Sequence, residues 1–599
     1  MQLRVALLGL AAVAPLTGWP ASVLAAPAAP SCVQSDAVRV WTSPRSPAVG
    51  QPLEIMAVAT DAGVDGLEVF DPTGQPLSLR TEPNGGPPWS LYATLFRPSR
   101  GTYRIQAMRG GRPVSCRDVE VGGAAGASRD FHSAQWDRAT EALYSAWIER
   151  LFDAPPGQRL SFPSLQPVLR NPGRNFLYGY LGQGEDDRLP ATPDCADLPY
   201  VLRAYFAWKV GLPIAYRSCS RGTTSSPPRC GAPVTEQGFG PAPRPASYFK
   251  GISRRIVDTV HSGSARTALG DEASDFYPVP LTRAALRPGT VYADPYGHVL
   301  VIVKWVPQSG SRSGLLLAVD AQPDNTVSRK RFWQGTFLFS DDVRSAGPGF
   351  KAFRPVVGEG GGKGRVRLLS HDALRRDARF VPYSAEQVGL RPDDFYARID
   401  RLINPRGLAP EMAYEATLDA LMEQIETRVT SVNNAEDYVR RTRGTVVPMP
   451  RGGAIFETTG PWEDYSTPSR DMRLLIAMKV LDSLPRRILR YPDLFVLTGE
   501  SAAEAKSRID RLHAQRMEER SITYRRSDGS PWRLSLKDIY DRRSRLEVAY
   551  NPNDCVELRW GAAPGTEEYA PCSRHAPPEQ RARMDEYRHW FRETRRPPR

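Results

Sequence analysis

Three polar side chains in the middle of the chain have the types that nucleophilic acyl transfer requires. Cys195 opens a run of apolar residues with helical spacing, His298 comes directly before a predicted strand, and Asp320 directly follows the next strand. A thiol nucleophile needs a base within hydrogen-bond reach, and the base needs a third group that fixes its tautomer. The set predicts a thiol that attacks a carbonyl carbon, with His298 as the base and Asp320 as the group that orients the imidazole.

The segment after Cys195 is predicted to be a helix that holds the thiol at its N-terminal end. Its apolar residues recur at the spacing of a buried helix face: Leu198, Val201, Leu202, Tyr205 and Phe206. Gly211 is expected to end the helix in a left-handed conformation. The helix dipole favours a thiolate at this position. Pro199 leaves two alternatives: either the helix begins near Asp197, or its first turn is distorted.

A predicted hairpin brings the base and its partner together. Strands are expected at 299–306 and 315–319, joined by a loop at 307–314 that is rich in Gly and Ser. Folding about this loop places His298 and Asp320 within a residue or two of direct register, at the spacing of cross-strand neighbours. Gln322 shares a face with Asp320 by the period of two. Gln322 is therefore the alternative candidate for orienting the histidine.

The oxyanion of such a reaction needs hydrogen-bond donors. The backbone N–H of Cys195 is the expected first donor, and Gln183 or Tyr180, from the loop before the helix, is a candidate for the second. The alternative is that this loop, which is rich in Gly and Tyr, only packs. Each residue of the catalytic set also has an ordinary structural alternative: a buried or disulfide-bonded cysteine, a hydrogen-bonded core histidine, or an aspartate in a turn.

The run from Cys195 to Arg217, with its Gly-Leu-Pro-Ile-Ala-Tyr-Arg end, resembles the nucleophile helix and following strand of transglutaminase-like proteins. The Asp194-Cys195 start and the His298-Val299 entry into a strand equally resemble NlpC-type cell-wall peptidases. The resemblance covers about residues 175–325. It implies a papain-like fold and cysteine-dependent acyl transfer, either as an amidase or peptidase on cell-wall peptides or as a cross-linking enzyme.

The cysteine count favours an exported protein with one free thiol. The seven cysteines are Cys32, Cys116, Cys195, Cys219, Cys230, Cys555 and Cys572. Six can pair within their own segments, as Cys32–Cys116, Cys219–Cys230 and Cys555–Cys572, which suits an oxidising compartment. Cys195 is then the odd cysteine, which calls for a chemical explanation. The alternative pairs Cys195 with Cys219 and leaves another cysteine over.

Residues 1–28 are typical of a cleaved signal peptide, with a basic start, an apolar core and small residues near the expected cleavage site. This predicts a periplasmic or secreted protein. The formal net charge of +13 allows peripheral association with an anionic cell envelope, although an arginine bias spread over the surface explains it more simply. No motif for nucleic-acid recognition is found in the sequence.

Four segments are expected after composition and patterning are compared along the chain. They are the signal peptide at 1–28, an all-β immunoglobulin-like sandwich at 32–121, an α+β papain-like domain at 131–356 and a mainly α-helical region at 365–599. In the last region helices are predicted at 392–402, 410–429, 435–441, 468–484, 502–519, 536–541 and 578–594.

Motifs for metal, nucleotide and dinucleotide binding are absent from the sequence, so no cofactor and no metal are expected. The expected function is that of an exported, thiol-dependent acyl-transfer enzyme acting on a peptide or cell-wall peptide. The alternative is a non-catalytic binding or scaffold protein of the periplasm that keeps the papain-like fold. The sequence does not predict an oligomeric state.

Overall fold

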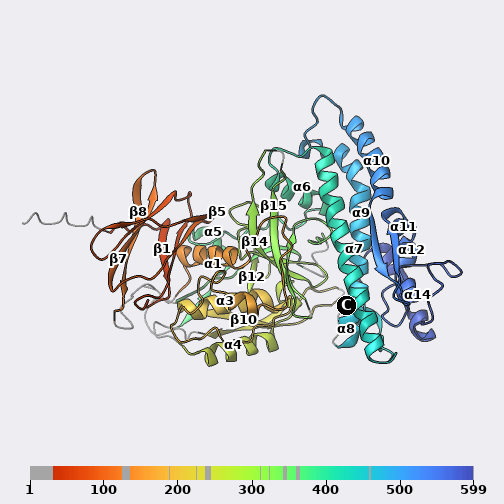
Figure 1. Cartoon of the computed structure of the whole chain (residues 1–599), viewed down its shortest axis with the longest axis horizontal. Coiled ribbons are helices and arrows are strands. Elements are labelled where there is room, and N and C mark those ends of the chain that lie inside the picture. The colour runs from red at the N-terminus through yellow and green to blue at the C-terminus, as the bar shows by residue number, and fades with distance from the viewer. Residues whose placement is uncertain are drawn as a thin grey trace, which may run out of the picture.

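The computed structural model shows an elongated chain with three successive parts (Figure 1). It describes residues 32–123, 135–187, 189–223, 225–236, 244–310, 312–322, 324–341, 347–358, 365–456 and 460–597. The predicted signal peptide at 1–28 lies outside these residues.

The N-terminal part contains two four-stranded antiparallel sheets. One has the order β1-β2-β6-β5 and the other β4-β3-β7-β8. The strands are β1 (Val38–Ser43), β2 (Leu53–Ala59), β3 (Gly66–Phe70), β4 (Pro76–Leu77), β5 (Glu82–Asn84), β6 (Trp89–Leu95), β7 (Gly101–Arg109) and β8 (Arg112–Val121). Ile55 of the first sheet and Ile105 of the second belong to one buried apolar cluster, so the sheets share a core.

The central part is a seven-stranded antiparallel sheet with helices packed against it (Figure 1). Its strand order is β12-β17-β13-β14-β15-β16-β9. The strands are β9 (Ser161–Phe162), β12 (Phe276–Pro278), β13 (Val291–Ala293), β14 (Val299–Val306), β15 (Leu315–Ala321), β16 (Val327–Arg331) and β17 (Gly349–Phe353). Both α1 (Arg138–Leu151) and α3 (Asp197–Val210) contact β14, and thereby link the helices to the strand that follows His298.

Smaller elements complete the central part. They are α2 (Gln166–Leu169), β10 (Ile214–Cys219), β11 (Cys230–Glu236), α4 (Ala246–Thr259), the 3-10 helix η1 (Ser262–Ala265), β18 (Val356–Gly358), β19 (Val366–Leu368), α5 (His371–Arg376) and α6 (Pro392–Ile403). The apolar core of this part continues through α6 to Ile403.

The C-terminal part is mainly helical and has its own apolar cluster, which includes Tyr414 and Phe591. Its elements are α7 (Pro410–Arg441), η2 (Gly452–Phe456), α8 (Pro461–Tyr465), α9 (Pro468–Arg490), η3 (Pro492–Leu494), α10 (Ala502–Glu519), β20 (Ser521–Arg525), β21 (Pro531–Ser535), α11 (Leu536–Asp541), α12 (Arg543–Leu546), α13 (Val556–Arg559) and α14 (Pro578–Glu593). A buried two-bond ion pair joins Arg428 of α7 to Asp471 of α9, at 2.8 and 2.9 Å.

The three expected disulfides are present: Cys32–Cys116, Cys219–Cys230 and Cys555–Cys572. Cys195 is free. Disulfides are typical of proteins that fold in an oxidising, exported environment. Within the described ranges, no helix combines the length and the apolar composition that crossing a bilayer requires.

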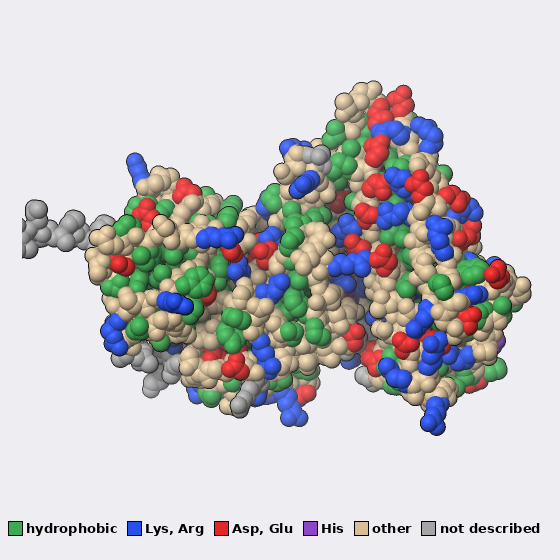
Figure 2. All heavy atoms as spheres, viewed as in Figure 1, with side chains coloured by type: hydrophobic (Ala, Val, Ile, Leu, Met, Phe, Trp, Pro, Cys, Tyr) green, Lys and Arg blue, Asp and Glu red, His purple; other side chains and the backbone are tan. Residues whose placement is uncertain are grey.

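Charged side chains of both signs are interspersed on the face shown in Figure 2, over the helical part in particular. No single-sign field dominates that view. On this face the basic side chains are therefore spread among acidic ones.

Candidate functional site

Helix α3 begins at Asp197 and places Cys195 two residues before its first turn. This resolves the question raised by Pro199, because the first-turn N–H groups of a helix have no intrahelical partner and a proline there costs little. Gly211 ends the helix with φ +81°, as expected. The Asp194 carboxylate accepts hydrogen bonds from the N–H groups of Ala196 and Asp197, at 2.8 and 3.0 Å, and thereby caps the helix start.

The Cys195 thiol lies against the backbone on both sides of His298. Its Sγ is 3.8 Å from the carbonyl oxygen of Gly297, and the N–H of Val299 donates to it. Among the described residues no hydrogen bond joins Sγ to the imidazole itself. The thiol thus lies against the turn that carries the base, with its sulfur directed toward the backbone.

The His298 imidazole is held by Asp320. Its Nε2 lies 2.9 Å from Asp320 Oδ2, so Nδ1 is the ring nitrogen left for a proton from the thiol. The side chain of His298 keeps 20% of its surface exposed, whereas Asp320 is almost fully buried. A partly exposed imidazole on a buried carboxylate is the arrangement that a fixed general base needs.

A β-bulge puts these two side chains on one face of the sheet. The register of β14 on β15 shifts between Ile302 and Lys304, so that Val301 pairs with Val319. Continued outward, this register sets residue 298 opposite Gln322 and residue 300 opposite Asp320. Without the extra residue of the bulge, the register would slip by one and His298 and Asp320 would face opposite sides.

Asp320 accepts three side-chain hydrogen bonds. Besides His298, Gln322 Nε2 donates to Oδ2 at 2.7 Å and Ser328 Oγ donates to Oδ1 at 2.9 Å. Asp320 lies inside β15, opposite Ser328 of β16, and not after the strand as the sequence suggested. Gln322 therefore contacts the orienting carboxylate, and the histidine is bound by Asp320.

Electrostatics keep Asp320 ionised. Burial alone would raise the pKa of this carboxyl, but Lys330, His298 and Ser328 outweigh it, so its pKa lies below the usual value. Ser328 and Lys330 were missed by sequence reasoning. Their positions in β16 follow from the pairing of that strand with β15, which no short motif marks.

The thiol is neutral at rest. Burial raises the pKa of Cys195 above its usual value, and the charges of Asp194, Asp320 and Asp197 raise it further, against the opposing hydrogen bond from Val299. The dipole effect expected at the helix start is thus outweighed. A reaction at this thiol must transfer its proton during attack, which is the role of a general base.

The electrostatic environment of the thiol can be tested through the effect of Asp197 on protein stability. Burial, and then the charge of Asp194, raise its pKa to about 8. Because the folded state keeps this proton to a higher pH than the unfolded state does, Asp197 destabilises the folded protein progressively as the pH rises. The loss begins near the ordinary pKa of 3.8 and continues up to about pH 8. We expect Asp197→Asn to be more stable than the parent by more than about 1 kcal/mol at pH 8, with the gain gone at pH 4.

Urea unfolding of both chains at pH 4, 6 and 8 measures this difference. Glu504→Gln is the control, because that carboxylate is exposed and belongs to the capping box of α10 in the helical part. A gain for Asp197→Asn that stayed constant with pH, or a loss at pH 8, would contradict the assignment.

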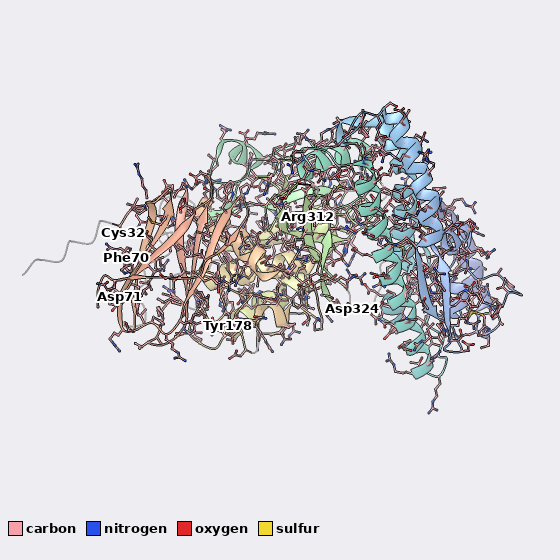
Figure 3. All side chains as sticks on the ribbon, turned by 45° about the horizontal axis from the view of Figure 1, so that its top comes forward. Cys32, Phe70, Asp71, Tyr178, Arg312 and Asp324 are labelled. Atoms are coloured by element: carbon pink, nitrogen blue, oxygen red, sulfur yellow. A yellow bond between two sulfur atoms is a disulfide. The ribbon has the colours of Figure 1, made fainter. Side chains whose placement is uncertain are left out.

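Gln183 and Tyr180 lie at the wrong end of α3 to serve the thiol. Their loop is bound through Glu185 and Asp186 to Lys209, in the last turn of the helix. Residues 195 and 209 are about 21 Å apart along a helix axis. Tyr178, in the same loop, lies toward the N-terminal sheets, whereas Asp324, four residues after Asp320, lies beside the helical part (Figure 3).

The expected second oxyanion donors are therefore not at the site, and the loop packs instead. Tyr180 is buried in the central core, and the backbone N–H of Gln183 donates to Glu185. The Cys195 N–H, by contrast, donates to none of the described residues and is free to bind an oxyanion.

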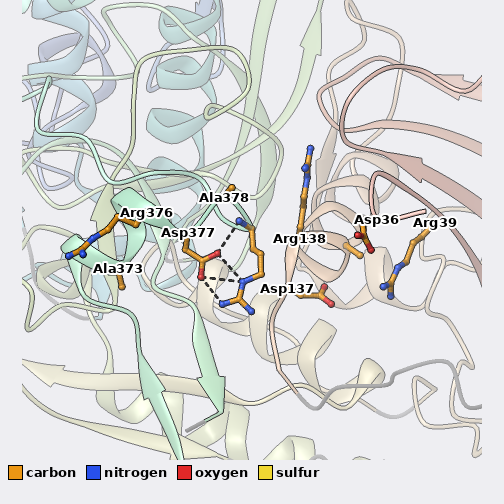
Figure 4. A pocket seen from close by; sticks show the side chains of 10 residues that line it. Asp36, Arg39, Asp137, Arg138, Ala373, Arg376, Asp377 and Ala378 are labelled. Carbon is orange, nitrogen blue, oxygen red and sulfur yellow. Dashed lines mark hydrogen bonds and ion pairs between the residues drawn. The ribbon is translucent and has the colours of Figure 1, made fainter. Parts of the chain in front are cut away.

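A cavity of about 730 Å³ lies apart from this site, between the N-terminal sheets, the start of α1 and the end of α5 (Figure 4). Its lining is mainly arginine and aspartate, including Arg39, Arg138 and the Asp377–Arg379 ion pair. It has no nucleophile, so we assign it no part in the chemistry.

One cluster with metal-ligand types occurs among the described residues, at Cys555, Glu557 and Cys572. Both sulfurs are joined in a disulfide, which removes the thiolates that a metal would bind. This cluster therefore does not fit a metal.

No family model matches the sequence, and comparison with curated proteins and with solved structures found no match.

Proposed function

We propose that the protein is an exported, thiol-dependent acyl-transfer enzyme whose central part is papain-like, of the transglutaminase or NlpC type. The observation that carries the proposal is the placement of Cys195 against the turn of His298, with the imidazole fixed by Asp320 through Nε2. In this proposal the N-terminal sheets form an immunoglobulin-like module and the chain follows its signal peptide to the periplasm or the exterior.

The reaction begins with a change of the Cys195 side-chain torsion that turns Sγ from the Gly297 carbonyl toward His298 Nδ1. The imidazole takes the thiol proton while sulfur attacks an amide carbonyl carbon. The Cys195 N–H donates to the oxyanion that forms. The C–N bond then breaks, the leaving amine takes the proton back from His298, and a thioester remains.

Water or a second amine resolves the thioester, again with His298 as the base. Water restores the thiol and releases a carboxylic acid, which is the outcome of an amidase or peptidase. An amine gives a new amide bond, which is the outcome of a cross-linking enzyme. Peptides of the cell wall are the substrate class that suits an exported protein of this kind.

A non-catalytic protein of the same fold is the second candidate, and one observation favours it. The thiol pKa is raised by burial and by three carboxylates, whereas thiol enzymes commonly lower it. In this alternative the chain binds cell-wall or protein partners.

A digest distinguishes the two. Purified mature protein is incubated with cell-wall peptides at neutral pH, and mass spectrometry follows released amine, new peptide ends and new isopeptide bonds. Any of these products supports the enzyme. Their absence from digests with several wall preparations, together with retention of wall fragments by the protein, supports the binding protein.

A further inference from the structure

The helical part of the chain contacts the turn that carries His298. This turn, Asp294 to Gly297, connects β13 to the histidine. Arg473 of α9 and Arg596, close to the end of the chain, both reach it from the helical part. No motif in the sequence gives the helical part a role, so these contacts need a separate explanation.

Asp294 is the centre of the turn. Its side chain is fully buried, and Oδ1 accepts the N–H of Tyr296 at 2.6 Å. Its own N–H donates to the carbonyl oxygen of His298 at 2.8 Å, and its carbonyl oxygen accepts the N–H of Gly297 at 3.2 Å. The position of His298 thus depends on the position of Asp294.

Arg473 neutralises this buried carboxylate from the helical part. Its Nη2 lies 2.6 Å from Asp294 Oδ2, and its Nη1 donates to the carbonyl oxygen of Thr336 at 3.2 Å. A buried carboxylate that loses its cationic partner is strongly unfavourable and must take a proton or move toward water. Either change would release the turn.

Arg596, near residue 599, binds the same turn through a hydrogen bond. One nitrogen donates to the carbonyl oxygen of Tyr296 at 2.5 Å, and another to Ser469 Oγ in the first turn of α9 at 2.8 Å. Its guanidinium also lies over the rings of Tyr296 and Phe456, at 5.5 and 4.9 Å from their centroids. The end of the chain therefore bridges α9 and the turn.

We infer that Arg473 and Arg596 are positioning residues, and that the helical part completes the active centre by holding the His298 turn against the thiol. The effect on catalysis rests on the proposed function, whereas the holding of the turn does not. The sulfur contacts Gly297 and Val299, so movement of the turn displaces the base and the backbone around the nucleophile together. Misplacement of about 1 Å can cost about a hundredfold in rate.

The test compares Arg473→Met and Arg596→Ala with Arg487→Met in the full mature chain. Arg487 is the matched control because it also lies on α9, also pairs with an aspartate of the central part, Asp400, at 2.6 Å, and is similarly shielded, with 17% of its side chain exposed against 19% for Arg473. A double variant, Asp294→Asn with Arg473→Met, removes the buried charge in case the single variant unfolds.

The first measurement is amide hydrogen exchange of peptides spanning 291–300, followed by mass spectrometry. We expect exchange at least about tenfold faster in Arg473→Met and Arg596→Ala, because the hydrogen-bonded amides of Asp294, Tyr296 and Gly297 lose their protection. Arg487→Met should exchange like the parent. Unchanged exchange in both test variants, or equal acceleration in the control, would overturn the inference.

The second measurement is the rate of Cys195 alkylation by iodoacetamide between pH 5 and 9. The free thiol makes the labelling specific, and His298→Ala defines the part of the rate that depends on the imidazole. We expect the His298-dependent part of the alkylation rate to fall about tenfold in Arg473→Met and Arg596→Ala, and to stay at the parent's level in Arg487→Met. If a variant shows faster amide exchange in the turn but keeps the whole His298-dependent alkylation rate of the parent, the turn does not position the base for the thiol.

The two measurements separate the inference from the proposed function. If His298→Ala leaves the alkylation rate of the parent unchanged, the imidazole does not serve the thiol and the proposed enzyme fails. Faster exchange in the arginine variants would then still show that the helical part holds the turn.

Discussion

Replacing Cys195 by alanine is expected to abolish product release in the cell-wall digest, with a loss of at least about 1,000-fold. The reason is that no other described cysteine has a free sulfur, so the chain has no substitute nucleophile at the turn. His298→Ala is expected to cost a similar factor, because the neutral thiol depends on the imidazole to accept its proton. The measurement is the initial rate of new peptide ends or isopeptide bonds.

The alanine variant should remain folded. The thiol contacts backbone groups, at Gly297 and Val299, and no described side chain hydrogen-bonds to it. Thermal unfolding of Cys195→Ala should therefore stay within a few degrees of the parent, about the shift that a loss near 1 kcal/mol produces. The double variant with His298→Ala should be no less active than either single variant, since the residues act as a unit. Equal product release by parent and Cys195→Ala would refute a thiol mechanism.

Local patterns predicted the elements that carry the site. Apolar spacing and the Gly211 stop marked α3, and the loop at 307–314 marked the hairpin of β14 and β15. The pairing of the six disulfide cysteines also followed from their spacing. These features depend on residues close together in the chain, which is why periodicity and turn chemistry reveal them.

Contacts between distant segments were not predictable in the same way. Gln183 and Tyr180 precede the Cys195 helix in sequence, but the buried ion pairs with Lys209 hold their loop at the other end of it. Arg473 lies 179 residues from Asp294, and no pattern in either segment points to the other. The bulge at residue 303 likewise depends on packing across the hairpin.

The helical part shows tertiary packing overriding local propensity. The sequence predicted two helices, at 410–429 and 435–441, because the polar residues between them are weak helix formers. The structure has one helix, α7, in which Val432 and Ala435 are fully buried. Burial of that face offsets the poor propensity. The hairpin of β20 and β21 was not predicted, although Ile522 and Tyr524 alternate with polar residues and the Asp528-Gly529 pair between the strands is a turn signal.

Replacing Asp320 by alanine should slow the digest about 100- to 10,000-fold, whereas Gln322→Ala should cost less than about tenfold. The difference follows from the geometry: Asp320 binds His298 Nε2 directly, and Gln322 only donates to the same carboxylate oxygen. Both are partners that the sequence proposed for the histidine. Initial rates of the two variants, measured under identical conditions, decide between them.

Asp320→Asn separates charge from shape. The asparagine oxygen can accept from His298 and Gln322 while its amide donates to the Ser328 hydroxyl, which can rotate to accept. The imidazole would stay in place without the carboxylate that stabilises its protonated form, so we expect a rate between those of the parent and Asp320→Ala. The pKa of Asp320 lies below its usual value, so the parent holds a carboxylate, and not a neutral acid, beside the imidazole at the neutral pH of the digest. A larger loss for Gln322→Ala than for Asp320→Ala would assign the orienting role to the glutamine and reject the geometry proposed for the reaction.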